Sequence, residues 1–326
     1  MVKNWLITGG CGFIGTALIT RILKENPEAG IRVLDNLSVG SRNDLSAVGE
    51  FKEIIVADTN GSPQGIELLV GDIRDIFECK TAATGVDVIV HLAANTGVGP
   101  SVENPVFDME CNVNGTLNML EAAREKSIAQ FVFASSGAPV GEVEPPIHEE
   151  IAPHPVSPYG ASKLAGEGYC SAYFQTFEVR TVALRFGNVY GPGSKHKSSV
   201  VAKFIRQALE GETCEVYGDG KQTRDFIYID DLLEAVILAA EFEDGGEVFQ
   251  IATSRESTVN EVVEMIKQEL KEIGNIDMKL VYGERRLGDV LRNFSDTTKA
   301  KNVLGWDPEH TLKDGIQKTV RYFLPE

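Results

Sequence analysis

The sequence predicts an α/β protein with a Rossmann-type, doubly wound parallel sheet and a smaller α/β lobe at its C-terminal end. Short apolar runs alternate with segments of helical apolar spacing through the first 180 residues. Small or polar residues follow each apolar run, where the carboxyl ends of parallel strands bind ligands. We therefore expect a dinucleotide-binding domain over 1–180, whose sheet also receives strands near 181–186 and 248–251, and a ligand-binding lobe over 187–326.

The first strand and helix flank a glycine-rich turn. Trp5 to Thr8 is apolar and is followed by glycines at positions 9, 12 and 15, after which apolar residues recur at helical spacing. Such glycines let the backbone turn tightly and approach a pyrophosphate at the amino end of the helix. Phe13 and Ile14 lie in this turn and join the predicted dinucleotide contacts. A tight strand-helix connection without a ligand is the alternative.

The second strand, 31–35, ends in Asp35, which stands 20 residues after Gly15. A carboxylate at this place binds the adenosine ribose hydroxyls and repels a 2′-phosphate, so NAD is favoured over NADP. Asn36 adjoins it and is counted as a cofactor contact. A loop-capping role is the alternative for Asp35. Residues 36–65 are polar and predict a loop with little regular structure.

Three more strands are expected at 66–70, 86–91 and 131–134, with a helix through 113–123. Asp72 follows the first of them and is placed to accept a bond from the adenine amine. His91 lies in an apolar run and is interpreted as a core histidine. Leu92, Ala93 and Ala94 are small enough for a flat cofactor to lie against the strand end.

Tyr159 and Lys163 lie four residues apart on one face of a predicted helix that Ser157 and Pro158 begin. Tyrosine has an ordinary pKa of about 10 and is no base at neutral pH. A neighbouring buried cation favours the phenolate, so we expect Lys163 to lower the pKa of Tyr159 into the range that proton abstraction requires. A capped helix start without catalysis is the alternative.

Composition restricts the class of protein. The chain has 326 residues, of which 43% are hydrophobic and 24% are charged, and its net charge is −17. This charge disfavours nonspecific binding to nucleic acid or to an anionic membrane. Five scattered cysteines without a Cys-x-x-Cys pair predict free thiols, a reducing, cytoplasmic location and no metal site. No long apolar run indicates a membrane span or a leader peptide.

These motifs together resemble the extended short-chain dehydrogenase/reductase superfamily. The resembling segments are Gly9 to Gly15, Asp35, Asp72-Ile73, His91 to Ala94, Ser135-Ser136 and Tyr159 to Lys163. The later half resembles the nucleotide-sugar epimerase/dehydratase family within it, through Leu184 to Gly193, Gly218 to Gly220, Thr223 to Ile227 and Arg285 to Val290. The motifs are closest to UDP-hexose 4-epimerases.

The resemblance implies roles for individual residues. Ser136, Tyr159 and Lys163 would be the catalytic residues, and Lys163 would also bind the nicotinamide ribose. Ile73 and Phe186 would join the NAD contacts. Asn188, Arg224 and Arg286 would bind the substrate diphosphate, and Asp289 the nucleoside ribose. For the two arginines, surface ion pairs with Asp225 and Asp289 are the alternative.

The reaction follows from what stands beside Ser136. Dehydratases that this chain resembles carry an Asp-Glu pair directly after the catalytic hydroxyl residue, whereas Gly137 and Ala138 occupy these places here. Decarboxylases of the family use a nearby glutamate, and none lies between Ser136 and Gly141. The resemblance then implies epimerisation at C4 of UDP-glucose and UDP-galactose. A UDP-uronate 4-epimerase, a 4,6-dehydratase, a reductase and a non-catalytic NAD-binding protein are the alternatives.

Three features depart from the pattern of the family or bear on the substrate. Pro139-Val140 replaces the usual Val-Tyr, and Cys111 replaces an asparagine that epimerases often have. Asn293 stands where some relatives have a tyrosine that narrows the sugar pocket, so a smaller side chain would admit N-acetyl sugars.

The rest of the chain is expected to form helices and strands with a structural role. Helices are expected at 200–209, 232–240, 259–270 and 312–323, and short strands at 215–217, 248–251 and 279–282. Residues 194–199 predict either a flap over the substrate or a solvated basic loop. The resemblance implies a homodimer through helices 106–124 and 158–176; small residues on the second helix fit this, and they fit packing within one monomer equally well.

Overall fold

The computed structural model describes residues 2–195, 197, 199–285 and 291–324. Two compact units make up the chain. Unit 1 comprises the chain up to Glu142, Glu149–Arg185 and Leu233–Phe249. Unit 2 comprises Val143–His148, Phe186–Leu232 and the chain from Gln250. The chain therefore passes between the units several times, so neither unit is one continuous segment.

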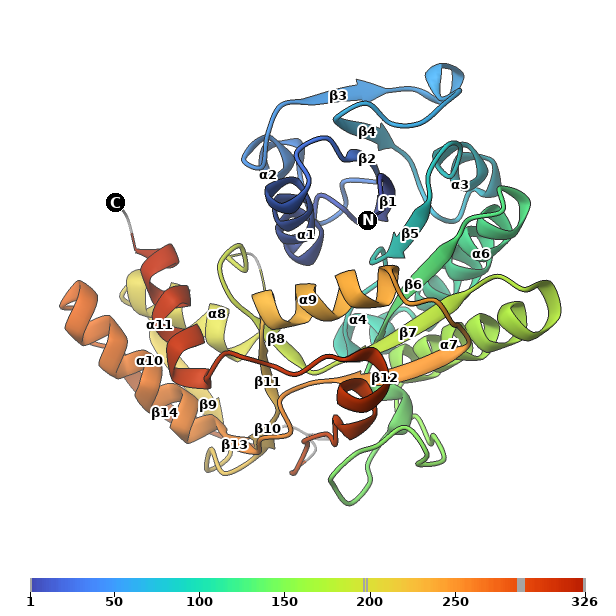
Figure 1. Ribbon diagram of the computed structural model, residues 1–326. Helices are drawn as coiled ribbons and strands as arrows, with labels where there is room; N and C mark the ends of the chain where they lie inside the picture. Colours follow the sequence, from blue (N-terminus) through green and yellow to red (C-terminus); the bar gives the residue numbers. More distant parts are fainter. Residues whose placement is uncertain (1, 196, 198, 286–290, 325–326) are drawn as a thin grey trace. The chain divides into compact units, whose positions relative to one another are not determined.

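Unit 1 is built on an eight-stranded sheet with the order β12-β7-β6-β5-β1-β2-β4-β3 (Figure 1). The strands are β1 (Asn4–Thr8), β2 (Gly30–Asp35), β3 (Phe51–Ile54), β4 (Ile66–Val70), β5 (Val88–His91), β6 (Gln130–Ser136), β7 (Thr181–Phe186) and β12 (Glu247–Ile251). All pairings from β6 to β3 are parallel. The predicted fold class is confirmed, and β7 and β12 join the sheet as expected.

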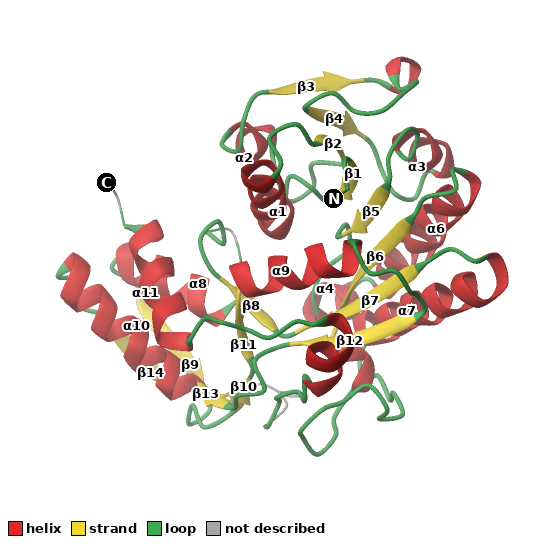
Figure 2. Ribbon diagram, in the orientation of Figure 1, coloured by secondary structure: helices red, strands yellow, loops and turns green. Residues whose placement is uncertain are grey.

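Helices cover both faces of this sheet (Figure 2). The helices of unit 1 are α1 (Phe13–Glu25), α2 (Arg42–Ser46), α3 (Ile76–Ala82), α4 (Val98–Glu103), α5 (Pro105–Met109), α6 (Gly115–Glu125), α7 (Pro158–Phe177) and most of α9 (Ile229–Ala240). On one face α1 and α9 are joined by an ion pair of 2.6 Å between Arg21 and Glu234. On the other, α3, α6 and α7 bury a core with Ile89, Leu120 and Phe131. Burial on both faces explains why the inner strands are almost wholly apolar.

A π-helical turn, Glu110–Asn114, joins α5 to α6, and a 3₁₀ turn, Ala138–Val140, follows β6. The single helix expected over 106–124 is therefore three consecutive helical segments. Asn104 caps α5 by accepting a hydrogen bond from the amide of Phe107 at 3.1 Å, with Pro105 in the first turn. An asparagine followed by a proline is typical of such a helix start.

Residues 36–65 hold more regular structure than predicted. The expectation of a loop is wrong for α2, for β3 and for a 3₁₀ turn at Val56–Asp58. Ser41 and Asp44 form a reciprocal capping box at the start of α2. Strand β3 lies at the sheet edge, where Lys52 and Glu53 are exposed, so it lacks the apolar run by which the other strands are recognised.

Unit 2 contains α8 (Val200–Leu209), α10 (Val259–Gly274) and α11 (Leu312–Phe323), at or close to the predicted bounds, with a π-helical turn at Ala300–Leu304. Three strand pairs accompany them: β8 (Asn188–Tyr190) with β11 (Phe226–Tyr228), β9 (Thr213–Tyr217) with β14 (Lys279–Gly283), and β10 (Thr223–Arg224) with β13 (Ser257–Thr258). Residues 143–148 belong here because Ile147 pairs with Ser295 and Glu144 binds Arg292 at 2.8 Å.

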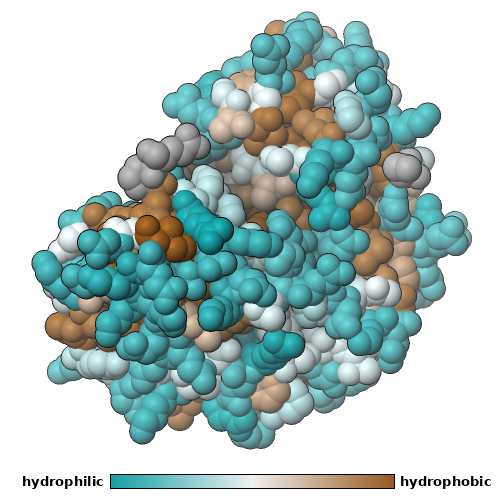
Figure 3. All heavy atoms as spheres, turned by 60° about the vertical axis from the view of Figure 1, so that its left-hand side comes forward, coloured by the Kyte–Doolittle hydropathy of each residue, from teal (hydrophilic) through white to brown (hydrophobic). Residues whose placement is uncertain are grey.

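Hydrophilic side chains dominate the face drawn in Figure 3, with apolar side chains in several small groups. No helix in the described part of the chain has the length and apolar character that a membrane crossing requires. All five cysteines are buried and unpaired, which confirms the prediction of free thiols. Within the same residues, no group of acidic, histidine and cysteine side chains is arranged to hold a metal ion.

Candidate active site

The glycine turn between β1 and α1 has the geometry of a phosphate cradle. Gly9 has φ +68°, and a Cβ built there would lie 2.9 Å from the amide nitrogen of Ala93. A Cβ at Gly15 would lie 2.5 Å from Cα of Gly10. Neither position accepts a side chain. The first turn of α1, which begins after Gly12, carries no acidic residue and no side-chain cap, so its positive end suits an anion.

Asp35 lies at the end of β2 and is 8% exposed. Its carboxylate accepts hydrogen bonds from the amides of Cys11 at 2.9 Å and Leu37 at 2.8 Å. Burial raises its pKa above the ordinary value, and these two amides oppose the rise. The bond to Cys11 ties the end of β2 to the glycine turn. The carboxylate and the cradle therefore lie together, as a dinucleotide site requires.

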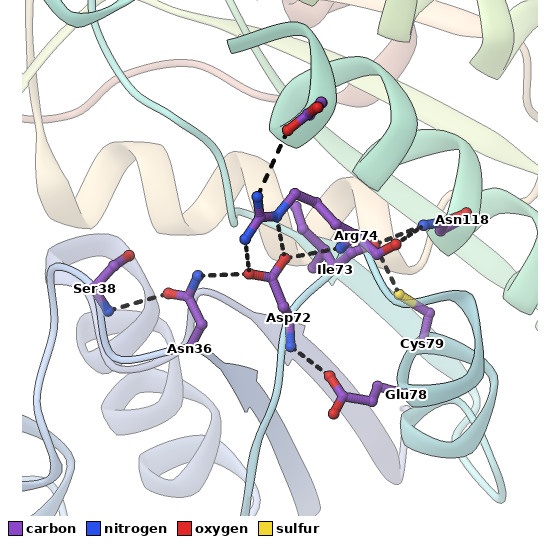
Figure 4. Close-up of polar contacts among 9 residues, drawn as sticks. Asn36, Ser38, Asp72, Ile73, Arg74, Glu78, Cys79 and Asn118 are labelled. Atoms are coloured by element: carbon purple, nitrogen blue, oxygen red, sulfur yellow. Dashed lines mark hydrogen bonds and ion pairs between the residues drawn. The ribbon is translucent and has the colours of Figure 1, made fainter. Parts of the chain in front are cut away.

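Asp72 follows β4 and anchors a polar cluster (Figure 4). Asn36 donates to its carboxylate at 3.1 Å, and Arg74 binds it with an ion pair of 2.9 Å. The Arg74 hydrogen bond lowers the pKa of Asp72 to about 2. Asn118 of α6 donates to the carbonyl of Ile73 at 2.9 Å. The expected cofactor residues Asn36, Asp72 and Ile73 are thus brought together and held in place by α6.

The end of β5 is packed against β1. His91 is 1% exposed and lies between the hydroxyls of Thr8, at 2.8 Å, and Thr116, at 3.2 Å. Burial and the charge of Lys163 lower its pKa to about 3. The interpretation as a core histidine is confirmed. Thr8 also accepts a hydrogen bond from the amide of Ala93 at 3.1 Å, which fixes the backbone of Leu92, Ala93 and Ala94 beside the glycine turn.

Ser136, Tyr159 and Lys163 meet at the end of β6. Ser157 caps α7 by accepting a hydrogen bond from the amide of Gly160 at 3.1 Å, so the predicted helix start is correct. Lys163 is 3% exposed, donates to the carbonyl of Ala134 at 2.8 Å, and has its Nζ 6.0 Å from the centre of the Tyr159 ring. Ser136 lies within hydrogen-bonding reach of the Tyr159 phenol.

The pKa of Tyr159 differs from the expectation. Burial raises the pKa of Tyr159 to about 12, and only the Ser136 hydrogen bond lowers it. Burial also lowers the pKa of Lys163 to about 8. The expected lowering of the pKa of Tyr159 by Lys163 does not appear among these effects, and burial holds the phenol above its ordinary pKa.

A buried ion pair lies one turn further along α7. Arg185 of β7 donates to both oxygens of Glu167, at 2.8 and 2.7 Å, and Ser135 donates to the same carboxylate at 2.5 Å. Both charged side chains are about 5% exposed. This pair joins β6, β7 and α7 directly behind the Ser136–Lys163 cluster.

Sequence reasoning missed a second polar network beside the cluster. Asn112 of the π-helical turn donates to Asp108 at 3.0 Å, to the carbonyl of Asn95 at 3.0 Å and to Ser162 at 3.1 Å. Ser162 in turn donates to the carbonyl of Tyr159 at 3.0 Å. An aspartate and an asparagine four residues apart in a stretch expected to be helical were the available signal.

Three residues expected to bind the substrate form hydrogen bonds to the segment 223–225 of unit 2. They are Asn188, Asn293 and Arg224, which is itself part of the segment. The amide of Asn188 donates to the carbonyl of Asp225 at 2.8 Å, and the amide of Asn293 donates to Thr223 at 3.4 Å. Arg224 donates to the carbonyl of Thr223 at 2.6 Å. The carboxylate of Asp225 is not at the surface, because it is 1% exposed and binds Thr253.

The remaining predicted site residues lie at the end of β7 or outside the described part of the chain. Phe186 is the last residue of β7. Arg286 and Asp289 lie outside the described residues, as do His196 and Ser198 of the expected flap.

Comparison with known proteins agrees with this geometry. Residues 5–252 match the model of the NAD dependent epimerase/dehydratase family. The chain is 36% identical to the UDP-glucose 4-epimerase of Mycolicibacterium smegmatis, over 98% of this chain and 97% of the relative.

Two solved structures are also similar. The UDP-glucose 4-epimerase of Thermus thermophilus in complex with NAD has a TM-score of 0.83 at 33% identity, over 98% of each chain. The UDP-N-acetylglucosamine 4-epimerase of Methanobrevibacter ruminantium in complex with UDP-N-acetylmuramic acid has a TM-score of 0.87 at 29% identity, over 99% of this chain and 98% of that one. The chain belongs to the NAD-dependent epimerase/dehydratase family of nucleotide-sugar enzymes, and its cofactor is NAD.

Proposed function

We propose that this protein catalyses NAD-dependent epimerisation at C4 of a UDP-hexose, interconverting UDP-glucose and UDP-galactose through a 4-keto sugar. The observation that carries the proposal is the cluster of Ser136, Tyr159 and Lys163 at the end of β6, followed in the chain by Gly137 and Ala138. Neither of these two residues transfers a proton, so elimination of water lacks its acid and base. UDP-glucose 4-epimerases among the relatives support the same reaction.

In this proposal each residue of the cluster has one task. Ser136 orients the C4 hydroxyl of the sugar by hydrogen bonding. Tyr159 takes the proton of that hydroxyl and later returns it to the 4-keto oxygen. Lys163 stabilises the phenolate that Tyr159 must become. NAD, when bound, accepts the hydride from C4 and returns it. Return to the opposite face of the keto sugar inverts C4 and leaves the cycle redox-neutral.

Residues of unit 2 would hold the nucleotide. We propose that Asn188, Arg224 and Arg286 bind the diphosphate and that Asp289 binds the nucleoside ribose. A chain with a net charge of −17 repels a dianion, so the diphosphate needs local guanidinium groups.

The test is turnover of UDP-galactose by the purified holoenzyme, followed by mass spectrometry and separation of the two sugars. We expect a product of unchanged mass and no net NADH. Loss of about 18 mass units would indicate a dehydratase instead. Tyr159→Phe should abolish turnover while NAD stays bound. Tyr169→Phe, a matched change on the exposed side of α7, should retain it. Activity in Tyr159→Phe would contradict the assigned base.

We also propose that the enzyme accepts the N-acetyl forms of both sugars. Asn293 lies beside Thr223 and replaces a tyrosine that narrows the pocket of some relatives. Asn293→Tyr should weaken binding of UDP-N-acetylglucosamine and leave binding of UDP-glucose unchanged, as measured by calorimetry. Asn302→Tyr, an exposed position of unit 2, controls for the added ring. Equal effects on both ligands would contradict this specificity.

A homodimer is the proposed assembly, formed through α5, α6 and α7. Val106, Phe107 and Met109 expose apolar side chains on α5, and Tyr169 does so on α7. Light scattering should give twice the monomer mass, and Val106→Glu should lower it. A monomeric wild type would contradict this assembly.

A further inference from the structure

Asp108 and Glu167 are two buried carboxylates of unit 1 whose charges favour the protonated form of Lys163, and their surroundings differ. Glu167 accepts hydrogen bonds from two nitrogens of Arg185, Nε and Nη2, and from the hydroxyl of Ser135, so its charge is balanced by a cation. Asp108 has no such balance. Its Oδ1 accepts from Asn112 at 3.0 Å and from Asn95 at 3.4 Å, both of which are neutral amides.

The second carboxylate oxygen of Asp108, Oδ2, is buried without a hydrogen-bond donor among the described residues. The whole residue is 1% exposed. A buried carboxylate without a cation or a full set of donors is costly to retain. Its helix, α5, packs against α7. The network from Asp108 through Asn112 and Ser162 ends on the carbonyl of Tyr159.

We propose that Asp108 is a positioning residue of the catalytic cluster: its uncompensated carboxylate keeps Lys163 protonated, and its bond to Asn112 holds the first turn of α7. This inference rests on the proposed epimerase function, for which Lys163 must carry a positive charge to stabilise the Tyr159 phenolate. It assigns a task to a residue that neither touches the sugar nor belongs to the Ser136–Lys163 motif.

The groups around Lys163 determine in which direction its pKa shifts when the charge of Asp108 is removed. Burial lowers the pKa of Lys163 to about 8, and three neighbouring groups raise it, Asp108 most and Cys170 and Glu167 less. Asp108 also raises the pKa of Tyr159. His91 of β5 also lies near Lys163 and is neutral near pH 7, because its pKa is lowered to about 3. Removing the Asp108 charge therefore lowers both pKa values, and Lys163 loses its proton at lower pH.

The first test is the rate–pH profile of Asp108→Asn, which removes the charge and keeps an oxygen for Asn112. We expect the alkaline fall in kcat to move about one pH unit lower. The KM and the NAD content should stay unchanged. Glu103→Gln, an exposed carboxylate on neighbouring α4, should leave the profile in place. A fall in kcat of the same factor at every pH would indicate a merely structural role and overturn the proposal.

The second test does not depend on turnover. Protein labelled with ¹³C at the lysine side chains is titrated by NMR, and the Lys163 signal is assigned by its absence in Lys163→Met. The midpoint of Lys163 should fall by about one unit in Asp108→Asn. An unchanged midpoint would overturn the role of Asp108 whether or not the enzyme acts on UDP-hexoses. A shifted midpoint in a protein that turns over no UDP-hexose would refute only the proposed reaction.

Discussion

Lys163 and Arg185 are two buried cations of the same unit with opposite surroundings. Both are less than 5% exposed. Arg185 binds a carboxylate through two nitrogens, whereas Lys163 donates to a single carbonyl, that of Ala134. A buried charge with a bidentate partner stabilises packing between its elements, whereas an underpaired one has a shifted pKa and is available for chemistry. The two sites show how one helix, α7, serves structure and reaction one turn apart.

The largest effect is expected from removing the underpaired cation. Lys163→Met should lower kcat by about 10³-fold, because the phenolate of Tyr159 loses its neighbouring charge. The variant should fold, since within the described residues Lys163 donates to a backbone carbonyl and forms no ion pair. Steady-state kinetics and circular dichroism measure the two properties, with exposed Lys126→Met as the control. Wild-type turnover in Lys163→Met would show that the charge of Lys163 is not needed for the reaction, and the contrast with Arg185 would fail.

Removing the carboxylate partner of Arg185, the paired cation, should lower the stability of the fold. Glu167→Gln leaves Arg185 buried without a counter-ion, so the free energy of unfolding should fall by about 3–5 kcal/mol. Urea denaturation measures it, and Glu178→Gln at the exposed end of α7 is the matched control. Adding Arg185→Met should restore most of the loss. A double variant as unstable as the single one would show that the pair does more than neutralise a charge.

A smaller effect concerns stability against pH. The pKa of Lys163 is about 8 in the folded protein, against about 10.4 in the unfolded chain. The unfolded state binds more protons between these values, so this residue makes stability rise as pH increases through that range. Lys163→Met should remove this part of the rise when urea denaturation is compared near pH 8 and near pH 10. An identical rise in both proteins would contradict the lowered pKa.

The smallest effect is expected at Asp72, at the exposed edge of the proposed cofactor site. The ion pair with Arg74 lowers the pKa of Asp72 to about 2, so its contribution to stability is present above the unfolded value and is lost as pH falls through about 2. Solvent screens the pair, since the Arg74 side chain is 39% exposed. Arg74→Gln should cost below about 1 kcal/mol at neutral pH. A larger loss in thermal unfolding would mean that the cation–π contact of Arg74 with Phe107 dominates.

Regular periodicity made much of the fold predictable. Helices α8 and α11 begin and end at the predicted residues because their apolar faces repeat at helical spacing. Strand β3 was missed because an edge strand exposes polar side chains. The same reasoning predicted that the glycine turn and Asp35 belong to one site, and the structure places them together through the bond between Asp35 and the amide of Cys11.

Properties that depend on neighbours distant in sequence could not be predicted. Arg185 and Glu167 are 18 residues apart, and Asn112 and Ser162 are 50 apart. The pKa of Tyr159 also depends on this packing, since burial raises it to about 12.

The sequence by itself determined the family and the cofactor through the resemblance of its motifs, and it determined most strands and helices because glycine spacing, apolar period and capping residues act locally. Only the tertiary structure decided which buried charges are paired. Whether a carboxylate such as Asp108 or Glu167 meets a cation depends on how β6, β7 and the helices pack, and a linear pattern does not contain that information.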